Sequence, residues 1–376
     1  MMGFIHDRVS AEGHAVDYLC ADDVPAAARG RWGRLVFPMF VRRRAIDAVR
    51  RHEPYDVINV HEPSGAAIVV GRHALGSPVV VLTSYGVEWR VWQASLDDLK
   101  AGRGGPSLRS RVVYPITELW QTSVGFRFTD HIFCQNSDDQ EFLMRRFGVP
   151  QDRFTKIFAA ADPIYALASA GRDYASATRL LFAGTWIPRK GTEDIVPAFA
   201  TLARRHRELK LTVLGAGVPT AAVLGAFPSD VRGRVSYVQT TNDRENADVF
   251  AKSDIYVLPT LFDGGPLTSV EAMMSGLPVV TTPVGLIKAA ISPGQNGLIV
   301  PARSPDAIVT AVERLLVDPA LREALGRAAQ RDALAKYTWD KIAQPVIDIY
   351  ESLAATRPGQ RDTRGTGPLQ EDSKIF

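Results

Sequence analysis

Short apolar runs alternate with longer amphipathic stretches along most of the chain. In the first half, strands are expected at residues 15–20, 56–61, 79–83, 131–135 and 156–159. In the second half, they are expected at residues 179–184, 210–215, 234–238, 254–258, 278–281 and 297–300. Several runs are apolar without alternation, which is typical of strands buried on both faces of a parallel sheet. Because helical stretches lie between most of them, the pattern predicts doubly wound α/β layers.

The alternation breaks once, and this break predicts two domains. Residues 163–178, PIYALASAGRDYASAT, are rich in Ala and Ser and show no clear period. We therefore expect an N-terminal domain over residues 1–165, a linker over 166–178 and a second α/β domain over 179–338. A chain of 376 residues also exceeds what one hydrophobic core usually supports.

The end of the chain predicts one further helix and a tail. Residues 339–356 place apolar side chains on one helical face, which must pack against another part of the protein. Residues 357–376 are polar without a period, so they predict a disordered tail whose removal is harmless.

Composition narrows the class of protein. Hydrophobic residues make up 46% and charged residues 23%, as in ordinary soluble domains, and the net charge of +3 does not indicate a nucleic-acid-binding protein. Cys20 and Cys134 lie in apolar runs and are expected to be buried thiols, which fits a reducing cytoplasm. No apolar run reaches the ~20 residues of a membrane span, and charges interrupt the N-terminal stretch where a signal peptide is apolar.

The most informative segment is LPTLFDGGPLTSVEAMMSGLPVVTTPVG, residues 258–285. A buried strand leads into a loop with Asp263, Gly264, Gly265 and Pro266, and a helix follows. Ligands bind at the carboxyl ends of strands in such sheets, and a free helix N-terminus suits a diphosphate. Glu271, one turn into the helix, is placed to accept hydrogen bonds from a ribose. An equally weighted alternative is a helix capped by Asp263 with a solvated Glu271.

A second loop, after the strand at residues 179–184, carries Arg189 and Lys190 before Gly191. Cations at the carboxyl end of a strand can neutralise the charge that develops on a leaving nucleoside diphosphate. An arbitrary Arg-Lys pair is more often a solvated loop. Two such loops in one sheet weaken that alternative.

These segments resemble glycosyltransferase family 4, the retaining transferases of the GT-B fold. The family pattern is a Glu, seven residues and a second Glu, followed by Ala-Met and Gly-Pro-Val. Here it reads Asp263…Glu271-Ala272-Met273, then Gly276-Leu277-Pro278-Val279-Val280. The family's Lys-Gly loop corresponds to Lys190-Gly191. The resemblance implies two Rossmann-like domains facing across a cleft, with the helix at residues 339–356 crossing back to the first domain.

The resemblance also implies roles for individual residues. Lys190 should contact the donor diphosphate, Glu271 the ribose and Asp263 the transferred sugar. Further donor contacts are expected from Arg189, Gly264, Gly265, Pro266, Leu267, Thr268, Gln239 and Thr240. The implied activity is that of a hexosyltransferase-like, metal-independent enzyme without a cofactor, because the nucleotide-sugar is a substrate. A glycan or lipid-linked molecule would accept the sugar in polysaccharide or glycoconjugate synthesis.

Three positions depart from the family pattern. Asp263 replaces the usual glutamate, Thr185 stands where an arginine is usual, and Tyr85 replaces a histidine that faces the donor sugar. Tyr85 can donate a hydrogen bond but carries no positive charge near neutral pH, so a catalytic role and simple aromatic packing both stay open. A degenerate sugar-nucleotide-binding subunit of a transferase complex is therefore the alternative function.

The chain opens at Met2–Asp7, within what the resemblance makes the first helix, so the family's first strand and Gly-rich loop are expected to be missing. Interior strands would then face a gap with unpaired backbone groups. We expect that the true start lies upstream or that the chain is a truncated copy. The alternative is that shifted strands fill the gap.

Residues 29–51 carry eight arginines against one acid, Asp47, with interleaved aromatic residues. Such a stretch can lie on an anionic membrane, which predicts a cytoplasmic protein peripheral to the inner membrane face. A solvated helix face is the alternative. A dinucleotide-binding oxidoreductase is a weaker rival, because Gly215 and Gly217 are followed by Thr220 where a third glycine is needed.

Overall fold

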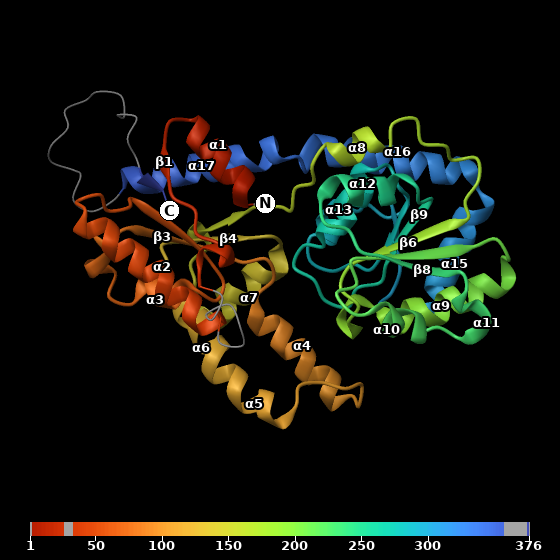
Figure 1. Ribbon diagram of the computed structural model, residues 1–376, viewed down its shortest axis with the longest axis horizontal. Helices are drawn as coiled ribbons and strands as arrows, with labels where there is room; N and C mark the ends of the chain where they lie inside the picture. Colours follow the sequence, from red (N-terminus) through yellow and green to blue (C-terminus); the bar gives the residue numbers. More distant parts are fainter. Residues whose placement is uncertain (1, 26–32, 357–373, 376) are drawn as a thin grey trace. The chain divides into compact units, whose positions relative to one another are not determined.

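The computed structural model describes residues 2–25, 33–356 and 374–375, and it divides into two compact units. Unit 1 comprises Met1–Ile157 and Ala343–Phe376, and unit 2 comprises Phe158–Ile342. Each unit contains one six-stranded sheet in which all paired strands are parallel, with helices packed around it (Figure 1). The sequence therefore predicted the α/β class and the parallel sheets correctly.

The sheet of unit 2 has the order β11-β10-β9-β6-β7-β8. Its strands are β6 (Arg179–Ala183), β7 (Lys210–Leu214), β8 (Val235–Val238), β9 (Ile255–Leu258), β10 (Val279–Thr281) and β11 (Leu298–Ile299). All of β9 and all of β10 are buried, because helices cover both faces of the sheet and leave no place for polar side chains.

The helices of unit 2 follow the strands in alternation. They are α8 (Ile164–Ala168), α9 (Thr192–Arg205), α10 (Thr220–Gly225), α11 (Ser229–Arg232), α12 (Asp243–Ala251), α13 (Leu267–Met274), α14 (Ile287–Ala290), α15 (Pro305–Val317) and α16 (Pro319–Lys336). The helix α17 (Trp339–Ala355) follows, and its residues from Ala343 onward belong to unit 1.

The segment expected as a linker, residues 166–178, is instead a packed part of unit 2. Arg172 donates hydrogen bonds to the carbonyl oxygens of Phe250 and Ser275, at 2.9 Å each, and to that of Ser253. These carbonyls lie at the carboxyl ends of α12 and α13, where a cation is favoured by the helix dipole. The sequence signal failed because one half-buried arginine, rather than an apolar period, anchors this segment.

The sheet of unit 1 has the order β1-β12-β2-β3-β4-β5. Its strands are β1 (Ala15–Val16), β2 (Val57–His61), β3 (Val79–Thr83), β4 (His131–Cys134), β5 (Phe154–Lys156) and β12 (Lys374–Ile375). Its helices are α1 (Met2–Ala11), α2 (Gly33–Arg50), α3 (Gly65–Val69), α4 (Glu88–Lys100), α5 (Leu108–Tyr114), α6 (Trp120–Phe128) and α7 (Ser137–Phe147). Among the described residues, no helix is long and apolar enough to cross a membrane.

The strand β12 corrects the expectation of a disordered tail over residues 357–376. Lys374 and Ile375 pair with Ala15 and Val16 of β1, and Ile375 also pairs with Val57 of β2. A strand from the far end of the sequence therefore fills the place between β1 and β2, where the sequence predicted a gap. Residues 357–373 lie outside the described part of the chain.

Two expected strands differ in extent from those observed. The strand expected at residues 15–20 ends at Val16, because its pairing with β12 involves only two residues. The strand expected at residues 156–159 begins earlier and ends at Lys156. Its ladder with β4 pairs Phe154 with Ile132, and this register, which depends on a distant strand, is not readable from the local sequence.

A chain that ends at Thr356 is expected to unfold at a lower temperature than the full chain. This contradicts the expectation from the sequence that removal of residues 357–376 is harmless. Within the described residues, β1 pairs only with β12, so the truncation removes its ladder. Thermal unfolding followed by circular dichroism should show a loss of roughly 2–4 °C. Ile375→Pro should act in the same direction because proline cannot donate to a ladder, whereas Gln370→Pro, outside β12, should not. An unchanged Tm in the truncated chain would contradict this role.

Candidate functional site

The candidate site of unit 2 lies where β6 and β9 end side by side. The two strands are hydrogen-bonded neighbours in the sheet, and both run in the same direction. The loop after β6 therefore begins at Gly184, next to the loop that follows Leu258. These are the two loops that the sequence singled out, and the structure brings them together.

Two glycines, one after β6 and one after β10, allow close approach to the loop that follows β9. Gly191 has φ +80°, and a Cβ atom there would lie 2.0 Å from the carbonyl oxygen of Pro259. Gly285 has φ +50°, and a Cβ atom there would lie 2.1 Å from the carbonyl oxygen of Asp263. Any larger residue would push the backbones apart, so both positions need glycine on steric grounds and for their left-handed conformation.

Lys190 and Asp263 form an ion pair between the two loops. The Lys190 ammonium donates a hydrogen bond to the Asp263 carboxylate. Their side chains are only 15% and 11% exposed, so removal of either one leaves a poorly solvated charge. The two residues expected to contact the diphosphate and the sugar thus lie in direct contact with each other.

Arg189 joins the same loops through its backbone and its side chain. Its guanidinium donates to the carbonyl oxygen of Phe262 at 3.1 Å, while its own carbonyl accepts from the Leu261 amide at 2.8 Å. Arg189 therefore shapes the loop that carries Asp263. The alternative of a solvated Arg-Lys pair does not describe this site.

The start of α13 faces this region with its backbone amides uncapped by side chains. Its N-cap is Pro266, which makes no side-chain cap, and the first turn holds no acidic residue. Thr268 is fixed from both sides: its hydroxyl donates to the carbonyl oxygen of Ala183 at 2.9 Å and lies 2.8 Å from the Tyr256 hydroxyl. Gly264 accepts from the Leu286 amide at 2.9 Å. Gly265 and Leu267 are half-buried beside them.

Glu271 lies on the buried side of α13 and is 8% exposed. Burial raises the pKa of its carboxyl to about 7, the neighbouring Tyr165 hydroxyl partly offsets this, and the Asp243 carboxylate adds to it. The alternatives of a solvated Glu271 and a helix capped by Asp263 are both wrong, since the N-cap is Pro266. Tyr165 and Asp243 were not singled out in the sequence, because only tertiary packing brings them to Glu271.

Gln239 and Thr240 follow β8 and make local contacts. Gln239 accepts from the Tyr237 hydroxyl, and the Thr240 hydroxyl donates to Asn246 of α12. Among the described residues, neither of them forms a hydrogen bond or an ion pair with Lys190 or Asp263. The residue that links this region to the site is Asp243, whose carboxylate charge helps to raise the pKa of Glu271.

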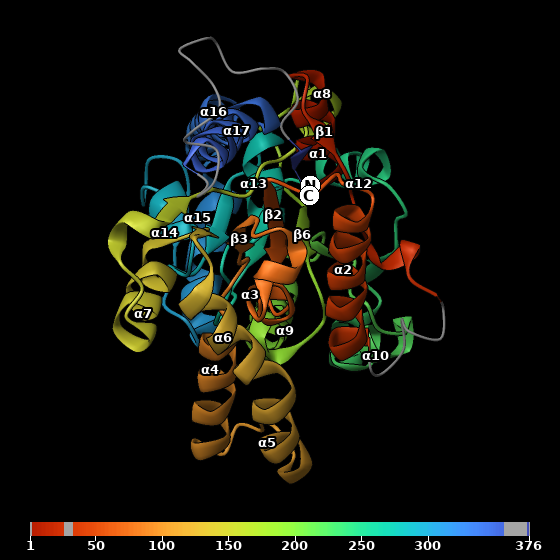
Figure 2. The same cartoon turned by 90° about the vertical axis from the view of Figure 1, so that its left-hand side faces the viewer.

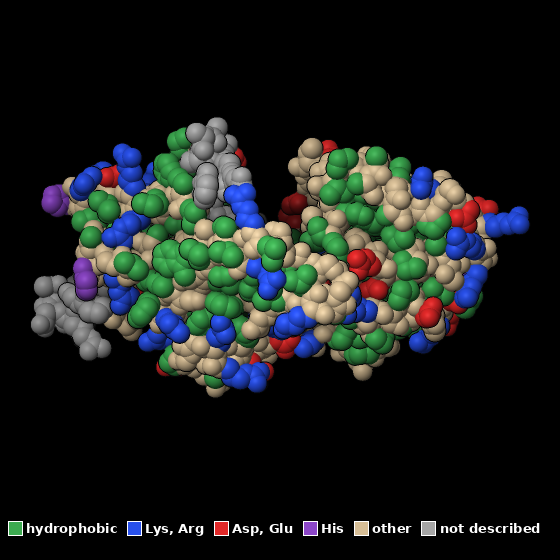
Figure 3. All heavy atoms as spheres, turned by 90° about the horizontal axis from the view of Figure 1, so that it is seen from below, with side chains coloured by type: hydrophobic (Ala, Val, Ile, Leu, Met, Phe, Trp, Pro, Cys, Tyr) green, Lys and Arg blue, Asp and Glu red, His purple; other side chains and the backbone are tan. Residues whose placement is uncertain are grey.

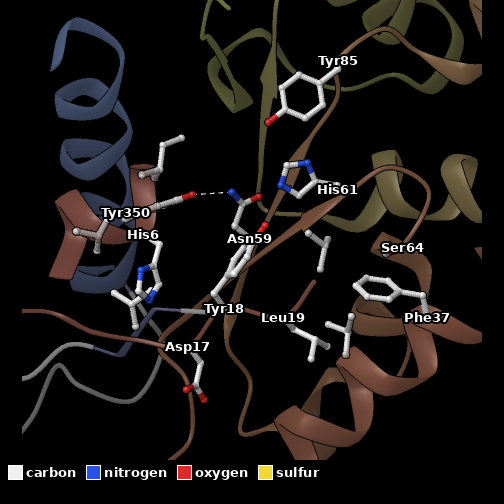
Figure 4. Close-up of a pocket in the computed structure, with 15 residues that line it drawn as sticks. His6, Asp17, Tyr18, Leu19, Phe37, Asn59, His61, Ser64, Tyr85 and Tyr350 are labelled. Carbon is white, nitrogen blue, oxygen red and sulfur yellow. Dashed lines mark hydrogen bonds between the residues drawn. The ribbon is translucent and has the colours of Figure 1, made fainter. Parts of the chain in front are cut away.

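Unit 1 contains a cavity of about 460 Å³ at the carboxyl end of β2 (Figure 4). It is lined by Ile5, His6, Val9, Val16, Asp17, Tyr18, Leu19, Phe37, Val41, Asn59, Val60, His61, Ser64, Tyr85 and Tyr350. Tyr85 stacks on His61, with ring centroids 5.3 Å apart. Burial lowers the pKa of His61 to about 4, so this imidazole is neutral near pH 7, and its buried Nε2 has no hydrogen-bond partner among the described residues.

Glu62 follows His61 directly after the end of β2. Burial raises the pKa of Glu62 to about 8, although the Ser84 hydroxyl and the Glu88 amide donate to its carboxylate at 2.7 and 3.1 Å. On the other side of the cavity, Asn59 donates to the Tyr350 hydroxyl of α17 at 2.6 Å (Figure 4). The consecutive polar residues after an apolar strand were the signal that could have found this cavity.

Glu271→Gln is expected to stabilise the protein at pH 8 and to have little effect at pH 4.5. The folded-state pKa of about 7 exceeds the ordinary value of 4.5, so the native state holds the proton more tightly than the unfolded chain. Wild-type stability therefore falls as the pH rises from 4.5 to 7, and the amide removes this loss. Urea unfolding across that range measures the difference, with the exposed Glu193→Gln as the control. A constant difference between the wild type and Glu271→Gln at every pH would contradict a buried, protonatable Glu271.

Residues 174–332, which include both loops and α13, match the family described as glycosyl transferases group 1. The uncharacterized glycosyltransferase MJ1607 of Methanocaldococcus jannaschii is 30% identical over 173 residues, which are 46% of this chain and 44% of that protein. The chain thus spans less than half the length of this relative.

Solved structures show the fold. WaaG, a glycosyltransferase involved in lipopolysaccharide biosynthesis, superposes with a TM-score of 0.69 at 16% identity, over 93% of this chain and 94% of its own. HepE of Anabaena in complex with UDP-glucose gives a TM-score of 0.62 at 16% identity, over 84% and 82% of the two chains. The chain has the GT-B fold, and its residues 174–332, which carry the candidate site, are similar to the group 1 glycosyltransferase family.

Proposed function

We propose that the protein is a retaining glycosyltransferase that binds a nucleoside-diphosphate sugar in unit 2 and transfers the sugar to a hydroxyl group of an acceptor. The observation that carries this proposal is the convergence of Lys190, Asp263 and the start of α13 at the ends of two neighbouring strands. In the reaction, the bond between the anomeric carbon and the diphosphate breaks. A bond to the acceptor oxygen forms, and the hydroxyl proton leaves with the diphosphate.

The diphosphate would bind at Lys190 and at the first amides of α13, at Leu267 and Thr268. Both groups supply positive charge without a metal ion, one as an ammonium and the other as uncapped N–H groups at the positive end of the helix dipole. In the unliganded site, Asp263 neutralises Lys190. An arriving phosphate would share this ammonium, which frees the carboxylate to accept a hydrogen bond from a sugar hydroxyl.

The nucleoside would bind one turn further along α13, at Glu271. Glu271 is buried and can accept hydrogen bonds from ribose hydroxyls, which also favours its ionised form. Gln239 and Thr240 stay predicted contacts of the base. The solved complex of HepE with UDP-glucose supports a uridine nucleotide as the first donor to test.

The acceptor is proposed to be a glycan or a lipid-linked molecule. WaaG, which shares the fold, takes part in lipopolysaccharide synthesis, and this supports the class without fixing the molecule. Tyr85 stays a predicted contact of the reacting sugar, and its stacking on His61 is compatible with that role and with packing alone. A cytoplasmic location is proposed from the donor class and from two cysteines that form no disulfide.

A binding subunit without turnover stays the second candidate, because Asp263, Thr185 and Tyr85 depart from the family pattern. The donor-site geometry favours the enzyme, since Lys190 and Asp263 are paired and only slightly exposed. The oxidoreductase hypothesis has no comparable support, because Thr220 of the β7 loop begins α10 where a third glycine is needed.

Lys190→Ala is expected to lower the rate of donor hydrolysis about 10²–10³-fold, as for the loss of one preorganised charge donor. Release of UDP from UDP-glucose by the purified chain measures this rate, and other nucleotide sugars follow if UDP-glucose is not used. Lys336→Ala, on an exposed lysine of α16, is the matched control. Unchanged turnover in Lys190→Ala would refute the phosphate contact, and donor binding without any turnover in the wild type would favour the subunit.

Transfer is expected to retain the anomeric configuration and to proceed in EDTA. An α-linked donor should give an α-linked product in a proton NMR time course, because the resemblance implies retention and Lys190 supplies the cation at the leaving group. Added MgCl₂ or MnCl₂ should change the rate less than twofold. An inverted product, or a strict requirement for either metal, would contradict this mechanism.

A further inference from the structure

An arm of two helices projects from the sheet of unit 1. In both ribbon views, α4 and α5 run side by side and away from the strands (Figures 1 and 2). Trp92 of α4 stacks on Tyr114 of α5, with ring centroids 4.9 Å apart, and this contact holds the arm together. After α5, the helical path continues through a wider turn at Pro115–Leu119 into α6.

A row of large apolar side chains lies exposed along this path. The row, named here the apolar ridge, consists of Leu108, Val112, Ile116 and Trp120, which are 78%, 62%, 65% and 49% exposed. Their spacing of four residues places them on one side of the helix. None of the residues of α5 is buried, so the ridge is not the edge of a core. Contiguous exposed apolar surface of this kind marks an interaction site.

Basic residues border the ridge. Arg109 and Arg111 of α5 are exposed, and neither forms an ion pair among the described residues. The acid on the same helical path, Glu118, is 7% exposed and does not offset them at the surface. Figure 3, seen from the side of the arm, shows hydrophobic side chains interspersed with Lys and Arg over unit 1. The surface therefore combines an apolar row with uncompensated positive charge.

The arginine-rich stretch at residues 29–51 offers less free charge than its sequence indicates. Arg42 donates to the carbonyl oxygens of Ala67 and Val70 at 2.8 and 2.6 Å. Arg43 and Arg50 lie within 3.9 and 3.2 Å of the same Asp47 carboxylate. Residues 29–32 lie outside the described part of the chain. Arg42 is thus held by backbone carbonyls, and the exposed Arg43 and Arg50 share one carboxylate, whereas Arg109 and Arg111 have no ion-pair partner among the described residues.

We propose that the apolar ridge is a docking surface for an anionic membrane. Leu108, Val112 and Ile116 would enter the boundary of the acyl chains, Trp120 would lie at the interface, and Arg109 with Arg111 would contact lipid phosphates. An amphipathic helix that presents exposed basic residues beside an apolar row fits an anionic lipid surface better than a protein partner. This inference does not depend on the proposed reaction, because the ridge lies outside the donor site.

Vesicle flotation of the full chain tests the proposal at 0.1 M NaCl. The wild type should float with vesicles of phosphatidylcholine and phosphatidylglycerol but bind pure phosphatidylcholine roughly tenfold or more weakly. The double variant Leu108→Ser, Ile116→Ser should lose binding to both kinds of vesicle. The double variant Arg109→Gln, Arg111→Gln should lose the preference for the anionic lipid.

Two controls separate a surface effect from a folding effect. Val317→Ser and Arg331→Gln change an exposed apolar residue and an exposed basic residue of unit 2, and they should float like the wild type. Each variant should keep the wild-type Tm and release UDP from UDP-glucose at the wild-type rate. Equal flotation of the ridge variant and the wild type would overturn the proposal. So would a wild type that does not float, or a wild-type dimer that the ridge variant dissociates.

Discussion

The pairing of β6 with β9 is the constraint from which the candidate site follows. Because parallel neighbours end at the same edge of a sheet, their loops must share one small volume above it. Gly191 and Gly285 make this sharing sterically possible, since a Cβ atom at either position would overlap a backbone carbonyl of the facing segment. The contact between Lys190 and Asp263 is a consequence of this approach rather than of their own pairing strength.

Burial gives the site its electrostatic character. Lys190 and Asp263 are only slightly exposed, so water screens the electrostatic interactions of their charges little. The pKa of Glu271 is raised because its carboxyl group is buried away from solvent. A ligand that brings hydroxyl groups to Glu271 and a diphosphate to Lys190 would supply hydrogen-bond donors to the buried carboxyl and a second anionic partner to the ammonium. A nucleotide-sugar has both features.

Unit 1 is organised differently, although its sheet is of the same kind. Its order depends on two residues from the far end of the sequence, which lie between β1 and β2. The carboxyl end of β2 borders a cavity in which a buried ring nitrogen of His61 has no hydrogen-bond partner within the described part of the chain. The arm of α4 and α5 lies apart from this core and exposes its ridge. The proposed donor site and the proposed membrane surface thus belong to different parts of the fold.

The sequence by itself determined the α/β class, most strand positions and the two loops of the donor site. This was possible because buried strands need uninterrupted apolar runs, and because close loops need glycines, both of which are local requirements. The roles of individual site residues stay predictions. Only the tertiary structure decided that Arg172 anchors the expected linker, that Tyr165 and Asp243 act on Glu271, and that the chain's last residues complete a sheet. Each of these depends on partners distant in sequence, so no local pattern encodes it.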